Sequence, residues 1–235
     1  STAVTKNISQ KLCPTLKLIQ ERMKQYSNSI YKLHNVNSYW IINDNTKIIK
    51  QIELLNSKNL IKNIATYDFT ILYTTLEHKD ILNNFDFLLS KSFNFSHKYI
   101  HVYSKNAFWS NNEVTDSIKR ICLNKTKVFN LIKWLINNTY FTFGDYVFKQ
   151  IIGIPMGTDA APLLCNLHLY TYELKFLEKE IRKNNNEVYK LNLTFRYMDD
   201  ITSLNDDNFF NNHYRLIYPN SLSLERINPS SSEAN

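Results

Sequence analysis

Three aspartates have settings in the sequence that suit chemistry. Asp68 interrupts an apolar run that extends from Asn63 to Tyr73, and Asp199 and Asp200 are adjacent to each other. Burying an unpaired carboxylate costs on the order of several kcal/mol, because the charge loses its hydration. Asp68 therefore needs a fixed partner, an exposed sheet edge or a metal ion, and the residues alone leave these three explanations open.

Two rigid carboxylate sites of this kind would suit a divalent cation. Mg²⁺ prefers hard oxygen ligands and is usually held by one or two carboxylates together with substrate phosphates. Two such ions about 3.5–4 Å apart can activate an attacking hydroxyl and stabilise the leaving oxygen in phosphoryl transfer. The aspartates are thus candidate ligands for magnesium-dependent phosphoryl transfer, although adjacent acids in a turn can also simply cap backbone amides.

The elements that would hold these aspartates are short strands. Residues 63–73 predict a buried strand, and residues 193–197 and 201–204 predict two more. Asp199 and Asp200 would then lie at the tip of a hairpin. The strand-forming residues on both sides would make that tip rigid.

Helical periodicity surrounds these strands. An apolar seam recurs at three- and four-residue steps from Leu16 to Leu33, and we expect Pro14 in the first turn of that helix. Thr74 and Glu77 form a T-x-x-E pattern that predicts a capping box for the helix after the first strand. Further helices are expected at residues 46–55, 112–123 and 127–137 and from residue 158 onward. The pattern indicates an α+β fold with strands embedded among helices.

The glycines are gathered in one place. The chain has only three, Gly144, Gly153 and Gly157, and all lie within one short stretch. Residues 141–148 predict a hairpin whose turn contains Gly144, which explains that glycine structurally. Because glycine permits close approach by a ligand, Gly153 and Gly157 remain candidates for a binding loop.

The composition limits the class of protein. The 235 residues carry a net charge of +7 and are 43% hydrophobic, which excludes a disordered or collagen-like chain. The sequence contains no run of about eighteen apolar residues that could span a membrane. Cys13, Cys122 and Cys165 follow no disulfide or zinc pattern, which fits a reducing compartment. The basic balance suits a polyanionic partner, with an ordinary solvated basic surface as the alternative.

Three ordered segments resemble the motifs of reverse transcriptases. The tetrapeptide YMDD at 197–200 is similar to their Y-x-D-D motif C. The segment DFTILY at 68–73 resembles motif A, and QIIGIPMGTDAAP at 150–162 resembles motif B. The wording of motif B, with NTYF at 138–141 before it, most resembles Penelope-like retroelements. Group II intron, retron and telomerase enzymes are more distant matches.

The resemblance implies a metal site and a steric gate. Asp68 and Asp199 would bind both catalytic Mg²⁺ ions, Asp200 would be a weaker or outer ligand, and Phe69 would lend a backbone carbonyl. Mn²⁺ would be able to substitute. Tyr73 would crowd a ribose 2′-hydroxyl and so favour deoxynucleotides, with plain core packing as the alternative.

The resemblance also implies contacts with substrates. The residues expected beside the incoming nucleotide are Phe69, Thr70, Tyr73, Gly153, Pro155, Met156 and Gly157. The residues expected beside primer or template are Gln150, Tyr197 and Met198. Arg226, in a motif D-like segment at 214–228, is a candidate for handling the pyrophosphate leaving group.

The implied architecture is a polymerase right-hand palm, a small antiparallel sheet packed on helices, with N-terminal helices, incomplete fingers and no thumb. Residues 1–58 would form the helical finger-side segment, 59–228 the palm and 229–235 a loose tail. The expected palm segments are motif A at 64–74, an insertion at 93–125, motif B at 150–167 and motif C at 195–202. Because the chain begins at Ser1, we expect a piece of a longer protein that polymerises slowly or not at all when isolated.

The function implied by the resemblance is RNA-directed DNA synthesis by a retroelement enzyme. Its expected partners are an RNA template, a DNA primer and dNTPs, without a membrane, and its expected location is intracellular, in the nucleus. The sequence leaves the oligomeric state open. Two alternatives stay open: an inactive palm that binds nucleic acid or protein, and an RNA-directed RNA polymerase, which the bulky Tyr73 disfavours.

Overall fold

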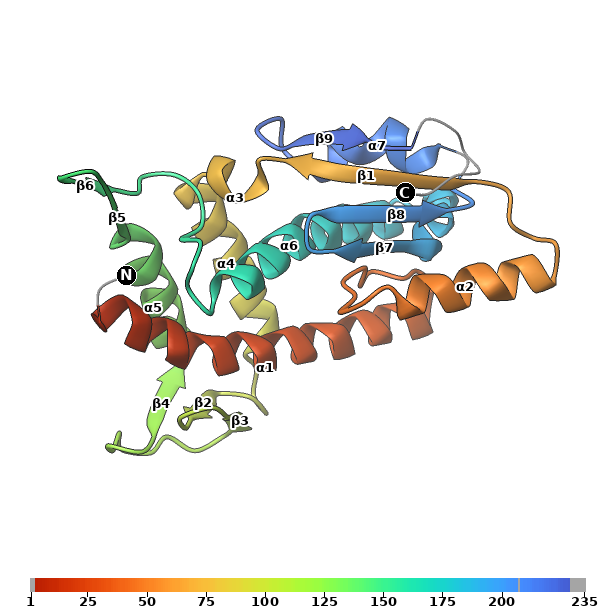
Figure 1. The fold of residues 1–235 in the computed structure, drawn as a ribbon. Coiled ribbons are helices and arrows are strands. Elements are labelled where there is room, and N and C mark those ends of the chain that lie inside the picture. Colours follow the sequence, from red (N-terminus) through yellow and green to blue (C-terminus); the bar gives the residue numbers. More distant parts are fainter. Residues whose placement is uncertain (1–2, 207, 229–235) are drawn as a thin grey trace. The chain divides into compact units, whose positions relative to one another are not determined.

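The computed structural model describes residues 3–206 and 208–228 (Figure 1), and these residues form two compact units. The first unit contains residues 3–25 and 73–171, and the second contains residues 26–72 and 172–228. Two long helices, α1 (Ala3–His34) and α6 (Ala161–Arg182), contribute residues to both units. The division expected at residue 58 stays a prediction.

A four-stranded antiparallel sheet forms the centre of the second unit, with strand order β7-β8-β1-β9 (Figure 1). Its strands are β1 (Ile64–Thr70), β7 (Thr194–Tyr197), β8 (Asp200–Leu204) and β9 (Ser223–Arg226). The three strands expected from the sequence are thus present. The first of them ends at Thr70, three residues before the predicted end, because Ile71 adopts a left-handed backbone conformation with φ of 59°.

One face of this sheet is buried against aromatic side chains. Successive side chains of a strand point to opposite faces, so Tyr67 and Phe69 lie on the same side of β1. The Tyr67 ring lies 4.9 Å from that of Phe210 in α7 (Phe209–Ile217), and the Phe69 ring lies 4.9 Å from that of Tyr218. These contacts anchor β1 from the side opposite to Asp68.

The other face of the sheet is buried at its Ile64 end. There Leu55 of α2 (Thr46–Ser57) packs with Ile64 and Leu204, a pair of directly opposed residues on β1 and β8. Asp68 lies on this same face toward the other end of β1, where it is half-buried and Asp200 is exposed. The 3₁₀ helix η1 (Asn186–Leu193) leads directly into β7. The acids are therefore accessible while the strands that carry them are fixed.

The first unit is mainly helical. Its helices are α3 (Leu72–Thr75), α4 (His78–Ser92), α5 (Lys125–Asn137) and the N-terminal parts of α1 and α6. Buried polar contacts join them: Asn84 Nδ2 lies 3.2 Å from His168 Nδ1, and the Tyr170 hydroxyl donates to the Met23 carbonyl at 3.3 Å. The helices expected at residues 127–137 and from residue 158 onward are confirmed in outline.

Two small sheets complete the first unit. The strands β2 (Tyr99–Val102), β3 (Ala107–Ser110) and β4 (Ile121–Asn124) pair in the order β3-β2-β4. The strands β5 (Tyr140–Phe143) and β6 (Tyr146–Lys149) form the expected hairpin, with Gly144 at φ of 59° in its turn.

The helix expected at residues 112–123 is wrong. Ser117 and Arg120 form a β-bridge there, and Cys122 pairs with His101 of β2. The Cys122 amide also donates to the Asp116 carboxylate at 2.6 Å. Ile118, part of the apolar pattern that suggested a helix, is fully exposed, so that pattern did not mark a buried face.

Two expected helix starts are also wrong. Pro14 lies inside α1, because the helix begins at Ala3, and the Ser9 hydroxyl in the added turns accepts a hydrogen bond from the Ala160 amide at 3.0 Å. The expected Thr74–Glu77 capping box does not form: residues 72–75 make the separate helix α3, and Glu77 at the start of α4 makes no side-chain cap. Leu33, at the end of the α1 seam, is 78% exposed.

Among residues 3–206 and 208–228, no helix is both long enough and apolar enough to cross a membrane. The tail expected at 229–235 lies outside the described residues.

Candidate active site

The three sequence-predicted aspartates come together at one end of the second unit's sheet. Asp68 on β1 lies directly opposite Asp200 on β8 in the antiparallel register. Side chains of directly opposed residues project from the same face with Cβ atoms about 4.5–5.5 Å apart. Asp199 occupies the adjoining turn, and its carbonyl accepts a hydrogen bond from the Phe69 amide at 3.3 Å. Residues from distant parts of the sequence therefore form one acidic cluster.

A tight turn between β7 and β8 holds Asp199. Tyr197 pairs with Asp200, so only Met198 and Asp199 form the loop of the hairpin. Met198 has φ of 55°, in the left-handed region where residues with a side chain are uncommon. Non-glycine residues in this region cost on the order of 1–3 kcal/mol and persist where the surroundings hold them. The turn is thus strained, and the surrounding structure must hold it in this conformation.

The acids repel one another. Burial raises the pKa of Asp68, and the charges of Asp199 and Glu225 raise it further, against a smaller lowering by the Phe69 amide. Burial also raises the pKa of Asp200, followed by the charges of Asp199 and Asp68. Partial burial and mutual repulsion make the cluster a favourable place for a positive charge to bind.

A fourth acid joins the row, and sequence reasoning missed it. Asp68 pairs with Asp200 on one side and with Glu225 of β9 on the other, so the side chains of all three project from one face of the sheet. Glu225 is exposed. No sequence signal indicates it, because only the register between β1 and β9 places it beside Asp68.

Arg226, the motif D candidate, does not join the acids. It pairs with Tyr67 across β1 and β9, which places it on the opposite face of the sheet from Asp68. Its guanidinium donates to the Asn208 side chain at 3.4 Å. The structure therefore separates Arg226 from the site that the sequence assigned to it.

The other predicted residues of the second unit surround the cluster. The Phe69 side chain is buried against Tyr218, so only its backbone is able to serve a ligand, and Thr70 pairs with Ser223 at the end of β1. The Tyr197 ring is 39% exposed, and Tyr197 and Asp200 line a hollow that also contains Thr66 and Ile48 of the second unit. This hollow gives a ligand room beside the acids.

The donor chemistry suits a hard divalent cation. Among the described residues, no group of three or more His, Cys, Asp or Glu side chains forms a ready-made metal cage. Mg²⁺ does not require one, since it usually keeps several waters and is held by one or two carboxylates and substrate phosphates. The opposed carboxylates of Asp68 and Asp200, with their raised pKa values, fit that mode of binding.

The predicted motif B loop lies in the first unit and contacts the segment after β1. The Gly153 amide donates to the Leu76 carbonyl at 2.7 Å, and the Ile154 amide donates to the Tyr73 carbonyl at 2.8 Å. Gly153 has φ of 85°, and a Cβ atom there would meet the Tyr73 carbonyl oxygen at 2.5 Å. The structure thus explains this glycine by a close backbone approach to Tyr73, the expected steric gate, which is half-buried in α3.

The remaining motif B residues follow in the same loop. Met156 is 64% exposed and Pro155 is buried. Gly157 has φ of 86° with open space around the position of a Cβ atom. The Gln150 side chain donates to the Ile152 carbonyl at 2.9 Å, so it supports the loop from within.

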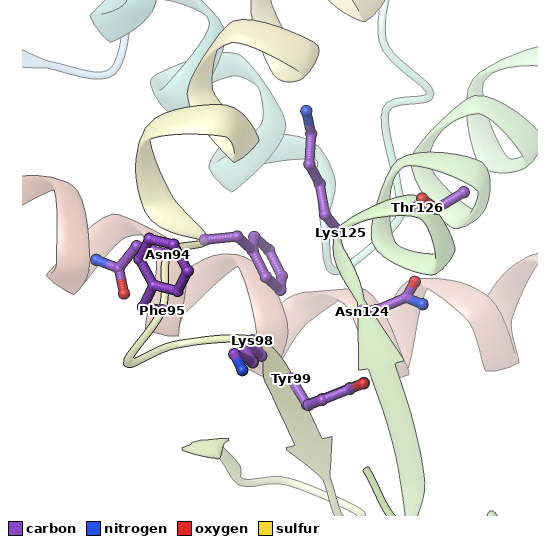
Figure 2. Close-up of a pocket in the computed structure, with 8 residues that line it drawn as sticks. Asn94, Phe95, Lys98, Tyr99, Asn124, Lys125 and Thr126 are labelled. Carbon is purple, nitrogen blue, oxygen red and sulfur yellow. The ribbon is translucent and has the colours of Figure 1, made fainter. Parts of the chain in front are cut away.

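Another hollow, which lies in the first unit, is lined by none of the predicted site residues. Figure 2 shows its lining, which comes from the segment after α4, from β2 and from the junction of β4 with α5. Lys125, one of its two lysines, lies 3.3 Å from the Asp86 carboxylate and donates to the Ser90 hydroxyl. That lysine is thus already engaged within the protein.

The fold of the chain is similar to that of solved telomerases, which align with nearly all of it. One is the telomerase of Candida albicans in complex with a TWJ fragment of telomeric RNA, with a TM-score of 0.63 and 14% identity. The alignment covers 95% of this chain and 36% of that one. Another is apo telomerase from Candida tropicalis, with a TM-score of 0.57, 15% identity and coverage of 91% and 37%.

The chain therefore spans little more than a third of the length of these telomerases. Neither a protein-family model nor a curated protein matches it. At this level of identity the likeness concerns the fold.

Proposed function

We propose that the chain is the palm, with part of the fingers, of an RNA-directed DNA polymerase that adds deoxynucleotides to a primer 3′-hydroxyl on an RNA template. The single observation that carries this proposal is the register of β1 and β8, which sets Asp68 opposite Asp200 beside the Asp199 turn. Three carboxylates on rigid elements, in a reverse-transcriptase-like fold, are what this chemistry needs.

The carboxylates would act on the substrates through bound cations. Two Mg²⁺ ions, or Mn²⁺ in their place, would supply activation of the primer hydroxyl and charge stabilisation on the triphosphate. Asp68 and Asp199 would hold them, Asp200 would assist, and the Phe69 carbonyl would complete the set. Exposure of Asp200 and partial exposure of Asp68 leave room for phosphate oxygens and water.

The motif B loop and Tyr73 would select the nucleotide. Gly153, Pro155, Met156 and Gly157 would approach the base and template, and the Tyr73 ring would exclude a ribose 2′-hydroxyl. The neighbouring telomerase structure was solved with RNA, which supports a nucleic-acid partner here. The wording of residues 150–167 supports a Penelope-like retroelement as the source, and with it a nuclear location.

A primer-extension assay tests the proposal in the full-length protein with an RNA template and Mg²⁺. Asp199→Asn should lower incorporation of deoxynucleotides by at least about a hundredfold, because the ion loses a charged ligand. Asp145→Asn is the matched control, since it makes the same change in the turn of the β5–β6 hairpin, and it should leave the rate unchanged. Equal incorporation by wild type and Asp199→Asn would reject the proposal.

A non-catalytic nucleic-acid or protein-binding palm is the second candidate. The observation that favours it is the net charge of +7, which suits a polyanionic partner whether or not catalysis follows. Titration of Mn²⁺ into the full-length protein, with and without a deoxynucleotide, separates the two functions. Metal binding that strengthens when the nucleotide is present supports the polymerase, and its absence supports the binding module.

A further inference from the structure

A buried arginine lies directly beneath the Met198–Asp199 turn. Arg196, on β7, is fully buried and pairs across the hairpin with Ile201. Alternation along the strand places Arg196 on the face opposite to Tyr197, so its charge lies on the buried side of the sheet. Burying a guanidinium is costly unless it is paired and hydrogen-bonded, so its partners explain its presence.

The partners of Arg196 connect a carboxylate to the turn. Its Nε lies 2.6 Å from Glu173 Oε1, and its Nη2 donates to Glu173 Oε2 at 3.4 Å. On another side of the guanidinium, Nη1 donates to the Met198 carbonyl at 3.0 Å. The planar fork of arginine is suited to holding two partners in fixed directions at once.

Glu173 and the backbone of Arg196 are themselves held in place. The Tyr218 hydroxyl donates to Glu173 Oε1 at 2.8 Å, and both side chains are buried. The Arg196 amide donates to the Trp40 carbonyl at 2.7 Å, and its carbonyl accepts from the Ile42 amide at 2.9 Å. The arginine is therefore fixed at its backbone and at its guanidinium.

The hydrogen bond from Arg196 reaches a turn whose backbone is strained. Met198 is in a left-handed conformation, and its carbonyl immediately precedes Asp199, the predicted metal ligand. A hydrogen bond from a charged donor to a strained turn can hold it in one conformation. Stability alone does not explain a buried ion pair, since hydrophobic residues of similar volume often make a protein equally stable.

We propose that Arg196, held by Glu173 and Tyr218, is a positioning residue that fixes the Met198–Asp199 turn and so orients the Asp199 carboxylate toward the cation site. The orienting role rests on the proposed polymerase function, whereas the fixing of the turn does not. Groups that orient a ligand from behind typically change metal affinity or activity by about 10–100-fold when they are altered.

The test compares Arg196→Lys with wild type in the full-length protein. Lysine keeps the charge, but its ammonium lacks the fork that meets Glu173 and the Met198 carbonyl together. Hydrogen exchange of residues 195–202 should become faster, Mn²⁺ affinity should fall by about tenfold or more, and kcat should fall with little change in the KM for dNTP. Tyr218→Phe should cause smaller changes in the same directions: a smaller rise in exchange and smaller losses of Mn²⁺ affinity and kcat.

Ser203→Ala is the matched control. It removes a buried hydroxyl that pairs with Thr194 at 3.0 Å, in the same two strands but away from the turn. It should lower stability without changing exchange at residues 195–202 or Mn²⁺ affinity. A double variant, Glu173→Leu with Arg196→Met, removes both buried charges together, so it keeps the comparison possible if the single variant fails to fold. It should show the same faster exchange and weaker Mn²⁺ binding.

The outcomes are distinguishable from failure of the proposed function. Unchanged exchange at residues 195–202 in Arg196→Lys, or faster exchange with unchanged Mn²⁺ affinity and kcat, would overturn the positioning role. Wild-type protein that neither binds Mn²⁺ nor extends a primer would reject the polymerase and with it the orienting role. The exchange measurement would still decide whether Arg196 fixes the turn.

Discussion

Asp68 and Asp200 lie directly opposite each other on neighbouring antiparallel strands, although most of the first unit separates them in the sequence. Like charges in directly opposed positions are destabilising. The chain keeps this pair where the sheet face is accessible, and Asp199 and Glu225 add further negative charge. The site therefore reduces the stability of the protein unless a cation binds there, and this conflict leads to the first prediction.

Asp68→Asn should stabilise the metal-free protein at neutral pH. The folded-state pKa of Asp68 is raised, so its contribution favours folding at acid pH and is lost as the pH rises through the raised pKa. Removing one of two opposed charges should recover about 0.2–1 kcal/mol, which corresponds to a rise in Tm of about 1–4 °C. Thermal unfolding at pH 4 and pH 7 measures this, and the gain should appear at pH 7 and shrink at pH 4.

Asp44→Asn provides the control for that measurement. Hydrogen bonds with Thr46 lower the pKa of Asp44, so neutralising it should bring no gain in stability at pH 7. Mg²⁺ should raise the Tm of wild type more than that of Asp68→Asn, because ligand binding to the folded state stabilises it. A lower Tm for metal-free Asp68→Asn at pH 7 would show that the repulsion is not the dominant effect.

Tyr73→Ala should admit ribonucleotides if the ring is the sugar gate. The variant keeps the backbone carbonyl that accepts from Ile154, so the loop contact at 2.8 Å should survive. We expect the ratio of kcat/KM for dNTP to that for rNTP to fall by at least about tenfold. Tyr73→Phe keeps the ring and should keep the preference for dNTP over rNTP. Unchanged discrimination between the two sugars in Tyr73→Ala would show that Tyr73 only packs in the core.

Gly153→Ala should destabilise the protein much more than Gly157→Ala. Both glycines have positive φ, but only at residue 153 would a Cβ atom meet backbone, at 2.5 Å from the Tyr73 carbonyl oxygen. We expect a cost of about 3 kcal/mol at Gly153 and about 1–2 kcal/mol at Gly157, where strain acts alone. Urea unfolding measures both variants, and equal losses would contradict the close approach.

Ile71→Gly should stabilise the second unit. Ile71 is a β-branched residue at φ of 59°, a true outlier, and its side chain is 66% exposed, so little burial is lost. We expect a gain of about 1 kcal/mol from relief of strain, reduced by the greater entropy of glycine in the unfolded chain. Asn59→Gly is the control, because asparagine tolerates its φ of 52° and should gain little. A loss of stability in Ile71→Gly would mean that its side-chain contacts outweigh the strain.

Local patterns were sufficient for several elements. The β1 strand, the β7–β8 hairpin, the β5–β6 hairpin and α5 follow from alternation, turn residues and helical period. These features depend on neighbours within a few residues. The same reasoning failed at residues 112–123, where pairing with β2 overrides an apolar pattern, and at Pro14, which lies inside α1 because the helix begins at Ala3.

The sequence by itself determined which residues are able to do chemistry: one aspartate on a predicted strand, two at the tip of a predicted hairpin, and two glycines in a loop after another hairpin. Only the tertiary structure decided which of them meet. Strand register is set by pairing across long sequence separations, so it placed Asp68 between Asp200 and Glu225, and it turned Arg226 to the opposite face. Tertiary packing also brought the Arg196 guanidinium, under the Asp199 turn, into contact with Glu173 of α6. A shift of one residue in register would reverse every side chain, and no local pattern encodes that choice.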